Sequence, residues 1–201
     1  MSKLKIPDRM KHLKIDPRGY PIPHSVVIDR DGTAHFAIAD EIIRQQVIRE
    51  GLCSICGTKL FRGRWLIGGP LSAFASNGAF LDPAMHDECA HFALQTCPYL
   101  AAPRYAREIG GAKAKASNVE KDFLLGVADE AEAGRPAGHL FIALMTVNRI
   151  ELINDGQYIK PRGAYNKIEF WQHGNRLSDA DGMRLIAEHY PEIIAHHEGG
   201  D

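Results

Sequence analysis

Two short Cys/His motifs constrain this chain more than any other feature. The first is Cys53-Ser-Ile-Cys56-Gly57, and the second is His86-Asp-Glu-Cys89. A C-x-x-C turn closes tightly around an ion, and two ligands three positions apart on a helix lie on one face. Zinc prefers four tetrahedral thiolate and imidazole ligands. The pattern therefore predicts one zinc site with Cys53, Cys56, His86 and Cys89 as its ligands, and a closed ligand set of this kind indicates a structural metal.

Two further side chains could be confused with ligands. Cys97 follows Cys89 by two helical turns, which places it about 12 Å further along a straight helix. We therefore expect Cys97 to be a small buried thiol at the end of that helix. His91 is rotated by about 200° from Cys89 around the helix axis, so we expect its imidazole to face away from the ion.

Composition narrows the class of protein. The chain has 201 residues, a formal net charge of −1 and four cysteines. No apolar run approaches the roughly 20 residues that a membrane helix needs, and no secretory signal is visible, so we expect a cytoplasmic protein without a membrane partner. In that compartment, paired cysteines more often bind metal than form disulfides. The first eighteen residues are locally basic, and we expect them to form a solvated arm.

The first half of the chain alternates strand and helix patterns. Residues 25–29 and 33–38 predict a β-hairpin, and Asp40 and Gly51 bracket a helix. After the first Cys motif, residues 59–61 and 64–67 predict a second hairpin, residues 71–81 a loop, and Asp82-Pro83 the start of a helix. A knuckle, a hairpin and a helix that carries the second ligand pair form the treble-clef arrangement. The sequence thus predicts a treble-clef zinc unit with a flanking hairpin.

The second half predicts more strands. A capping box at Ser117 and Glu120 starts a helix, and Ser178 caps a last helix that runs to about His189. Strands are expected at residues 139–147, 149–153, 157–160 and 166–172. The predicted fold class is therefore α+β, with a zinc-containing region over residues 1–109 and an α+β region over 110–201 that packs against it. The strand at 166–172 could be a partner-binding edge or ordinary core.

Six stretches in roughly the first half of the chain stand out together. They are Pro7-Asp-Arg-Met10, Arg18-Gly-Tyr-Pro-Ile-Pro23, Cys53-x-x-Cys56-Gly57, Gly69-Pro70, Pro83-x-Met85-His86-x-x-Cys89-Ala90 and Cys97-Pro-Tyr-Leu100. In these stretches the chain resembles a family of uncharacterised proteins from bacteria and their phages. The resemblance implies phage or bacterial origin and a zinc site, with no assigned activity.

The predicted hairpin tip, Phe61-Arg-Gly-Arg-Trp65, could contact nucleic acid. Arg62 and Arg64 would bind phosphates, and Phe61 or Trp65 would stack on a base. The alternative is a solvated turn whose aromatic side chains pack inward. Strand alternation favours this second interpretation, because it places Trp65 and Ile67 on one face and Arg64 and Leu66 on the other.

Two functions remain in competition at this point. The first is a non-enzymatic zinc-binding protein that binds a host macromolecule, either protein or nucleic acid, through a surface that zinc organises. The alternative is a treble-clef zinc-dependent nuclease or another hydrolase. Some treble-clef nucleases use a histidine at the hairpin to activate water, and here the hairpin carries arginines instead. The sequence therefore favours the binding protein and assigns no catalytic residue.

Overall fold

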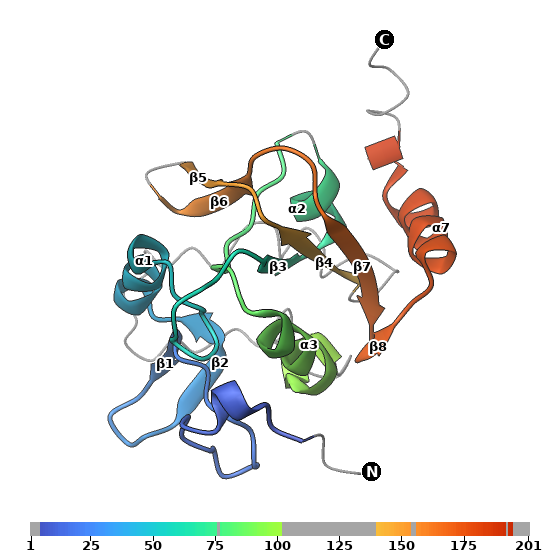
Figure 1. Ribbon diagram of the computed structural model, residues 1–201. Coiled ribbons are helices and arrows are strands. Elements are labelled where there is room, and N and C mark those ends of the chain that lie inside the picture. Colours follow the sequence, from blue (N-terminus) through green and yellow to red (C-terminus); the bar gives the residue numbers. More distant parts are fainter. Residues whose placement is uncertain (1–4, 76, 102–139, 154–155, 192, 195–201) are drawn as a thin grey trace.

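A four-stranded antiparallel sheet forms the centre of the molecule (Figure 1). The computed structural model describes residues 5–75, 77–101, 140–153, 156–191 and 193–194. The sheet contains β3 (Arg64–Gly68), β4 (Leu140–Thr146), β7 (Lys167–Gln172) and β8 (Asn175–Arg176), in that spatial order. In the register, Leu66 lies opposite Leu144, and Ile142 lies opposite Phe170. Helices and antiparallel sheets together confirm the α+β class.

Both faces of this sheet are buried, and strand alternation divides its side chains between two cores. Trp65, Ile67 and Trp171 join the core that contains the cysteine motifs. Leu66 and Phe170 join the core on the opposite face. The expected separation of Trp65 and Ile67 from Leu66 is therefore confirmed. Because β7 lies between β4 and β8, it is not a free edge, and its residues Phe170 and Trp171 belong to the core, whereas Lys167 and Ile168 at its start are exposed.

Helices cover the two faces of the sheet. On the cysteine side lies α3 (Asp87–Thr96), which is followed at once by α4 (Pro98–Ala101). On the other side, α2 (Pro70–Phe74) and α7 (Asp179–His189) contribute apolar side chains to the core. Ser178 caps α7 by accepting a hydrogen bond from the backbone N–H of Asp181, as the sequence predicts. Among the described residues, no helix is long and apolar enough to cross a membrane.

The N-terminal part adds a short 3₁₀ helix, η1 (Asp8–Met10), a hairpin and a helix. The predicted hairpin is present as β1 (Val26–Ile28) and β2 (Ala34–Ala39). The predicted helix is α1 (Glu41–Glu50), with Asp40 accepting from the N–H of Ile43 and Gly51 in the left-handed conformation. The buried Arg44 links α1 to a second hairpin, β5 (Ile150–Ile153) and β6 (Tyr158–Pro161), because its guanidinium donates to the carbonyls of Gly156 and Gln157.

Three local predictions around the cysteine motifs are wrong. Residues 59–61 do not form a hairpin with β3; Lys59 makes a single bridge to Leu52, and β3 pairs with β4 instead. The helix begins at Asp87 and not at Pro83, because Met85 pairs with Trp65 in an extended conformation. The expected loop at 71–81 begins with the short helix α2, for which Pro70 is a favourable first residue.

The pairing of β3 with β4 joins the two halves of the chain. β3 lies in the expected zinc-containing region, 1–109, and β4 lies in the expected second region, 110–201. The two halves therefore share one sheet, and their division into separate regions stays a prediction. The strands expected at 139–147, 149–153 and 157–160 are present as β4, β5 and β6. The helix that the capping box at Ser117 predicts lies outside the described residues.

A glycine in α7 allows close packing of this helix on the sheet. A Cβ atom at Gly182 would lie 2.1 Å from Cγ of Phe170. Helix propensity favours Gly→Ala by about 1 kcal/mol, whereas overpacking a core costs about 1–3 kcal/mol. A contact of 2.1 Å places the packing cost at the upper end of that range, so we expect Gly182→Ala to lower the free energy of unfolding by about 2 kcal/mol, as measured by urea denaturation. Met183→Ala, at an exposed position of the same helix, is the control, and an unchanged or higher stability for Gly182→Ala would contradict this packing.

Candidate metal centre

Four side chains from two separate segments meet beneath the central sheet. Cys53 and Cys56 lie in the turn that follows α1, His86 is the N-cap residue of α3, and Cys89 lies in its first turn. All four are buried, and their ligand atoms lie within 4.8 Å of one another. Tetrahedral ligands at about 2.0–2.3 Å from one ion would be about 3.3–3.8 Å apart. Only small shifts would bring the cluster to that geometry, so these residues are close enough to hold a metal ion.

The backbone of the first motif forms a tight knuckle. The N–H of Gly57 donates to the carbonyl of Cys53 at 2.8 Å, and the N–H of Cys53 donates to the carbonyl of Thr58 at 2.8 Å. Gly57 has φ +70°, and a Cβ there would lie 2.8 Å from the His24 ring. Both the positive φ and the close approach require glycine at this position. The knuckle thus aims both cysteine thiols at the same point.

Hydrogen bonding orients His86 for ligation. Its Nε2–H donates to the carbonyl of Lys59 at 3.0 Å, which fixes the tautomer because a carbonyl can only accept. The other ring nitrogen, Nδ1, then presents its lone pair to the cluster, 3.4 Å from Sγ of Cys56. The backbone N–H of His86 also points at Sγ of Cys53, 3.4 Å away. Such outer partners are typical of metal-ligating histidines.

Hydrogen bonds among the three thiols shift their pKa values. Hydrogen bonds from Cys53 and Cys89 lower the pKa of the Cys56 thiol far below its ordinary value, and the Thr58 hydroxyl adds to this effect. The same hydrogen bonds, together with burial, raise the pKa of Cys89. A divalent cation would replace the protons of the thiols, so metal binding would release protons to solvent.

The N-terminal segment packs against this centre. Met10 is buried in the same core as the three cysteines. Nε2–H of His12 donates to the carbonyl of Cys56 at 3.0 Å, and Arg9 forms a 2.7 Å ion pair with Glu88 in the first turn of α3. These contacts hold residues 9–12 on the knuckle, so the segment is not a free arm, whereas the basic side chains of Lys5, Lys11 and Lys14 are exposed to solvent as expected.

Cys97 and His91, which were predicted not to bind the metal, both lie outside the cluster. Cys97 is the C-cap residue of α3. His91 turns away from the cysteines and lies between Trp65 and Trp171. Its Nδ1–H donates to the carbonyl of Asp87 at 2.8 Å, and its Nε2 lies 2.7 Å from Oε2 of Glu169. Both ring nitrogens are thus engaged within the chain.

Glu169 is the buried centre of this second polar network. Its side chain lies on β7 and accepts a hydrogen bond from Nε1–H of Trp171 at 3.1 Å. Its other oxygen forms ion pairs with Lys167 at 2.6 Å and Arg176 at 3.4 Å. Burial alone would raise the pKa of Glu169, but the hydrogen bonds and charges of Lys167, His91 and Trp171 outweigh it and lower the pKa below its usual range.

The predicted nucleic-acid residues Arg62 and Arg64 are not part of the Cys/His cluster. Arg62 is exposed in the loop before β3, and Arg64 is the first residue of β3, where its guanidinium donates to the carbonyl of Asn148 at 3.2 Å. Of the two aromatic candidates, Trp65 is buried, whereas the side chain of Phe61 is 68% exposed. The turn therefore offers Phe61 and not Trp65 to solvent.

Comparisons of the chain with protein-family models, with curated proteins and with solved structures found no match. The resemblance to a phage and bacterial family therefore stays a prediction. Sequence reasoning missed the supporting partners Lys59 and His12, whose roles depend on long-range packing. Thr58 was also missed, although its place directly after the Cys-x-x-Cys-Gly motif is a local signal.

Replacing one cluster cysteine tests the ligand assignment. We expect Cys56→Ala to lose stoichiometric metal and several kcal/mol of stability, since structural zinc contributes roughly 10–16 kcal/mol to small zinc domains. Cys97→Ala is the matched control, and we expect it to keep the metal and to change stability by less than about 1 kcal/mol. Elemental analysis and urea denaturation measure the two effects. Metal-free Cys97→Ala protein, or fully loaded Cys56→Ala protein, would contradict the assignment.

Glu169→Gln tests the second network and its pH dependence. Loss of the charge weakens the contacts to Lys167 and His91, so we expect stability at pH 7 to fall by about 1–3 kcal/mol. Because the folded-state pKa is lowered, this contribution is fully present above the unfolded value of about 4.3 and is lost as pH falls through the folded-state pKa. The stability difference between wild type and variant, measured by urea denaturation, is therefore expected to shrink below pH 4. A difference that is constant from pH 7 to pH 3 would exclude this role.

Proposed function

We propose that this chain is a non-enzymatic zinc-binding protein of phage or bacterial origin that binds nucleic acid. The contact surface is the basic end of the central sheet. This surface is formed by five side chains that come from distant parts of the sequence, namely Arg62, Arg64, Arg149, Arg162 and Lys167. Zinc would fix the knuckle and α3 in place and so preorganise the loop that carries Arg62.

The donor set supports zinc as the metal. Three thiolates and one imidazole are soft to borderline ligands, which suit zinc better than calcium, magnesium or manganese. Cys53 and Cys56 would come from a knuckle, and His86 and Cys89 from the start of a helix, which is the order of ligands in a treble clef. Four protein ligands leave no open position for a reactive water, so the metal would be structural.

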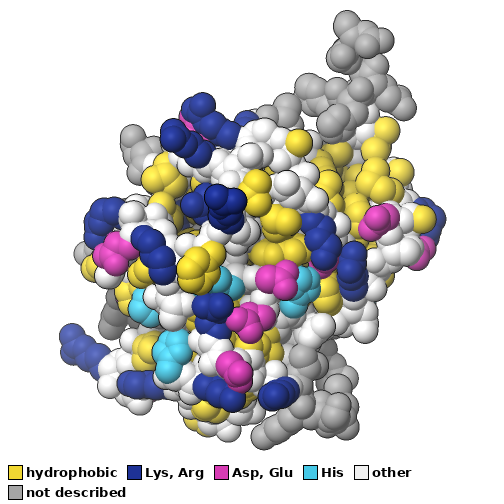
Figure 2. Space-filling model, in the orientation of Figure 1, with side chains coloured by type: hydrophobic (Ala, Val, Ile, Leu, Met, Phe, Trp, Pro, Cys, Tyr) yellow, Lys and Arg dark blue, Asp and Glu magenta, His cyan; other side chains and the backbone are white. Residues whose placement is uncertain are grey.

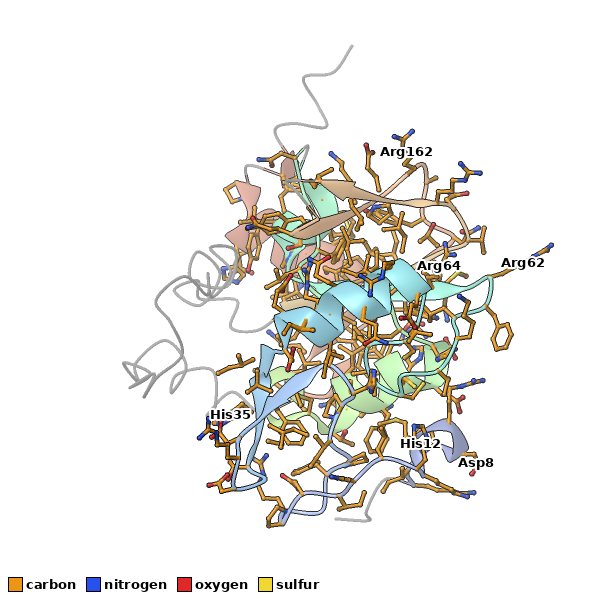
Figure 3. All side chains as sticks on the ribbon, turned by 90° about the vertical axis from the view of Figure 1, so that its left-hand side faces the viewer. Asp8, His12, His35, Arg62, Arg64 and Arg162 are labelled. Carbon is orange, nitrogen blue, oxygen red and sulfur yellow. The ribbon has the colours of Figure 1, made fainter. Side chains whose placement is uncertain are left out.

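Strand register carries the nucleic-acid proposal, because it gathers the arginines at one end of the sheet. Arg64 begins β3 and lies opposite Thr146, the last residue of β4. Lys167 begins β7 and pairs with Met145, so it lies at the same end. Arg149 follows β4 closely, and the N–H of Arg162 donates to its carbonyl at 3.0 Å. Figure 3 shows Arg62, Arg64 and Arg162 along one side of the molecule, with Arg62 extended into solvent.

The charges at this end are only partly balanced. Arg162 pairs with Glu151 at 3.1 Å, and Lys167 pairs with Glu169. Within the part of the chain that the structure describes, Arg62, Arg64 and Arg149 have no carboxylate partner. On the face that Figure 2 shows, Lys and Arg side chains (dark blue) are spread among apolar side chains (yellow) and fewer Asp and Glu side chains (magenta). Unpaired guanidinium groups beside one another suit a phosphate backbone, which binds by displacing counterions.

Phe61 adds a stacking group next to these cations. Its ring is largely exposed and lies 6.2 Å from the imidazole of His86, measured between ring centroids. An exposed aromatic ring beside arginines favours unpaired bases, because base–aromatic stacking contributes about 1–3 kcal/mol per base. Single-stranded nucleic acid is therefore the preferred partner. For the competing nuclease function, His91 is a poor general base, because both of its ring nitrogens are already engaged.

The salt dependence of binding tests this proposal. We expect wild-type protein to bind a fluorescent single-stranded oligonucleotide with an affinity that falls steeply as salt rises. Each lost phosphate contact reduces the slope of log K against log salt by about 0.7 for a single strand. Arg62→Ala/Arg64→Ala is therefore expected to reduce the slope by about 1.4, and Phe61→Ala to weaken binding by about tenfold with the slope unchanged. Fluorescence anisotropy at several salt concentrations measures both quantities.

Arg184→Ala is the matched control for the charge change. Arg184 is an exposed cation on α7, distant in the fold from the basic end, and it pairs with Asp181. We expect this variant to bind like wild type. Wild-type protein that binds neither DNA nor RNA at low salt would refute the proposal, as would equal losses for Arg184→Ala and Arg62→Ala/Arg64→Ala.

A further inference from the structure

An apolar cavity lies next to the basic end of the sheet. It has a volume of about 290 Å³ and lies between α1, the start of the knuckle, the first residue of β3 and the β5–β6 hairpin. Small-molecule sites in proteins usually have volumes of about 300–1,000 Å³, so this cavity suits a small ligand. Its walls are mainly aliphatic and include Val47, Ile48, Leu52, Leu60, Ile150 and Ile159.

Two guanidinium groups supply the charge of this cavity. Arg64 and Arg149 line it, and no Asp or Glu is among the described residues that do. Arg64 uses one nitrogen to donate to the carbonyl of Asn148, which leaves further N–H groups of its fork for a ligand. Arg149 is exposed, and its side chain has no partner among the described residues. The two positive charges therefore favour an anionic ligand, and the apolar walls favour a ligand with an aliphatic group.

The walls of the cavity are held by contacts that do not need a ligand. The N–H of Leu60 donates to the carbonyl of Gly51 at 2.9 Å, which closes the base of the metal knuckle. On the other side, Arg44 fixes the β5–β6 hairpin to α1 through the carbonyls of Gly156 and Gln157. A preformed site of this kind loses little conformational entropy when it binds.

We propose that this cavity binds a carboxylate attached to an aliphatic group. Arg64 and Arg149 would bind the carboxylate, and the aliphatic walls would enclose the chain. A nucleobase fits less well, because the described residues that line the cavity include no aromatic side chain and no charged groups besides the two arginines. The carboxylate could belong to a free medium-chain fatty acid or to the C-terminus of a polypeptide that ends in an aliphatic residue. This inference does not depend on nucleic-acid binding.

Isothermal titration calorimetry of the metal-loaded full chain tests the inference. Decanoate is the probe for a free acid, and decyltrimethylammonium is its cationic counterpart of equal chain length. For the polypeptide source, the probes are an acetylated tetrapeptide ending in leucine with a free carboxylate and the same peptide with a C-terminal amide. We expect decanoate, the carboxylate peptide or both to bind, and the cation and the amide to bind at least tenfold more weakly. The stronger of the two carboxylates identifies the source.

Two surface variants separate specific binding from general apolar adsorption. Arg149→Ala removes an exposed side chain, so the fold is expected to be retained, and binding of the carboxylate is expected to weaken by about tenfold or more. Leu152, which lines the cavity and is 46% exposed, gives a second variant, Leu152→Asp, whose charge would repel the same ligand. Arg184→Ala, which removes an exposed cation on α7, is the control and is expected to bind like wild type. No binding of either carboxylate at millimolar concentration, equal binding of the cation, or unchanged binding by Arg149→Ala would overturn the inference.

Discussion

The contact between the cysteine knuckle and the start of α3 is the interaction on which the remaining structure depends. Cys53, Cys56 and Cys89 belong to the same core as Trp65, Ile67 and Trp171, so this cluster is continuous with one face of the central sheet. The segment between Cys56 and Arg64 has little regular structure of its own. A metal that joins the knuckle to α3 would therefore determine where Phe61 and Arg62 lie and how far they extend.

Two buried charged groups complement this centre. Glu169 links β7 to His91 of α3 and holds Lys167 and Arg176 at the surface. Arg44 links α1 to the β5–β6 hairpin through backbone carbonyls. Buried charges of this kind are tolerated only where hydrogen bonds or opposite charges compensate them, and they favour one arrangement of the elements around them. Together with the Cys/His cluster, they position the basic end of the sheet and the adjacent aliphatic cavity.

Local signals predicted much of this fold, and long-range pairing explains what they missed. Asp40 with Gly51 and Ser178 with Asp181 are caps that depend on a few neighbouring residues, so both helices were predicted closely. The spacing of the two Cys/His motifs likewise predicted that Cys53, Cys56, His86 and Cys89 would cluster. By contrast, β3 pairs with β4, which lies more than 70 residues later in the chain. Neighbouring residues carry no signal of such a pairing, so a hairpin at residues 59–67 was predicted instead. Similarly, α3 begins at Asp87 and not at the predicted Pro83, because Met85 pairs with Trp65 in an extended conformation.

X-ray absorption spectroscopy at the zinc K edge, on purified and untagged protein, tests the metal assignment most directly. We predict one zinc per chain, with three sulfur atoms at about 2.3 Å and one nitrogen atom at about 2.0 Å in its first coordination shell. The imidazole nitrogen would come from His86 and the sulfur atoms from Cys53, Cys56 and Cys89. A first shell dominated by oxygen, fewer than three sulfur ligands, or protein that carries no stoichiometric metal would contradict this centre and the preorganised surface that depends on it.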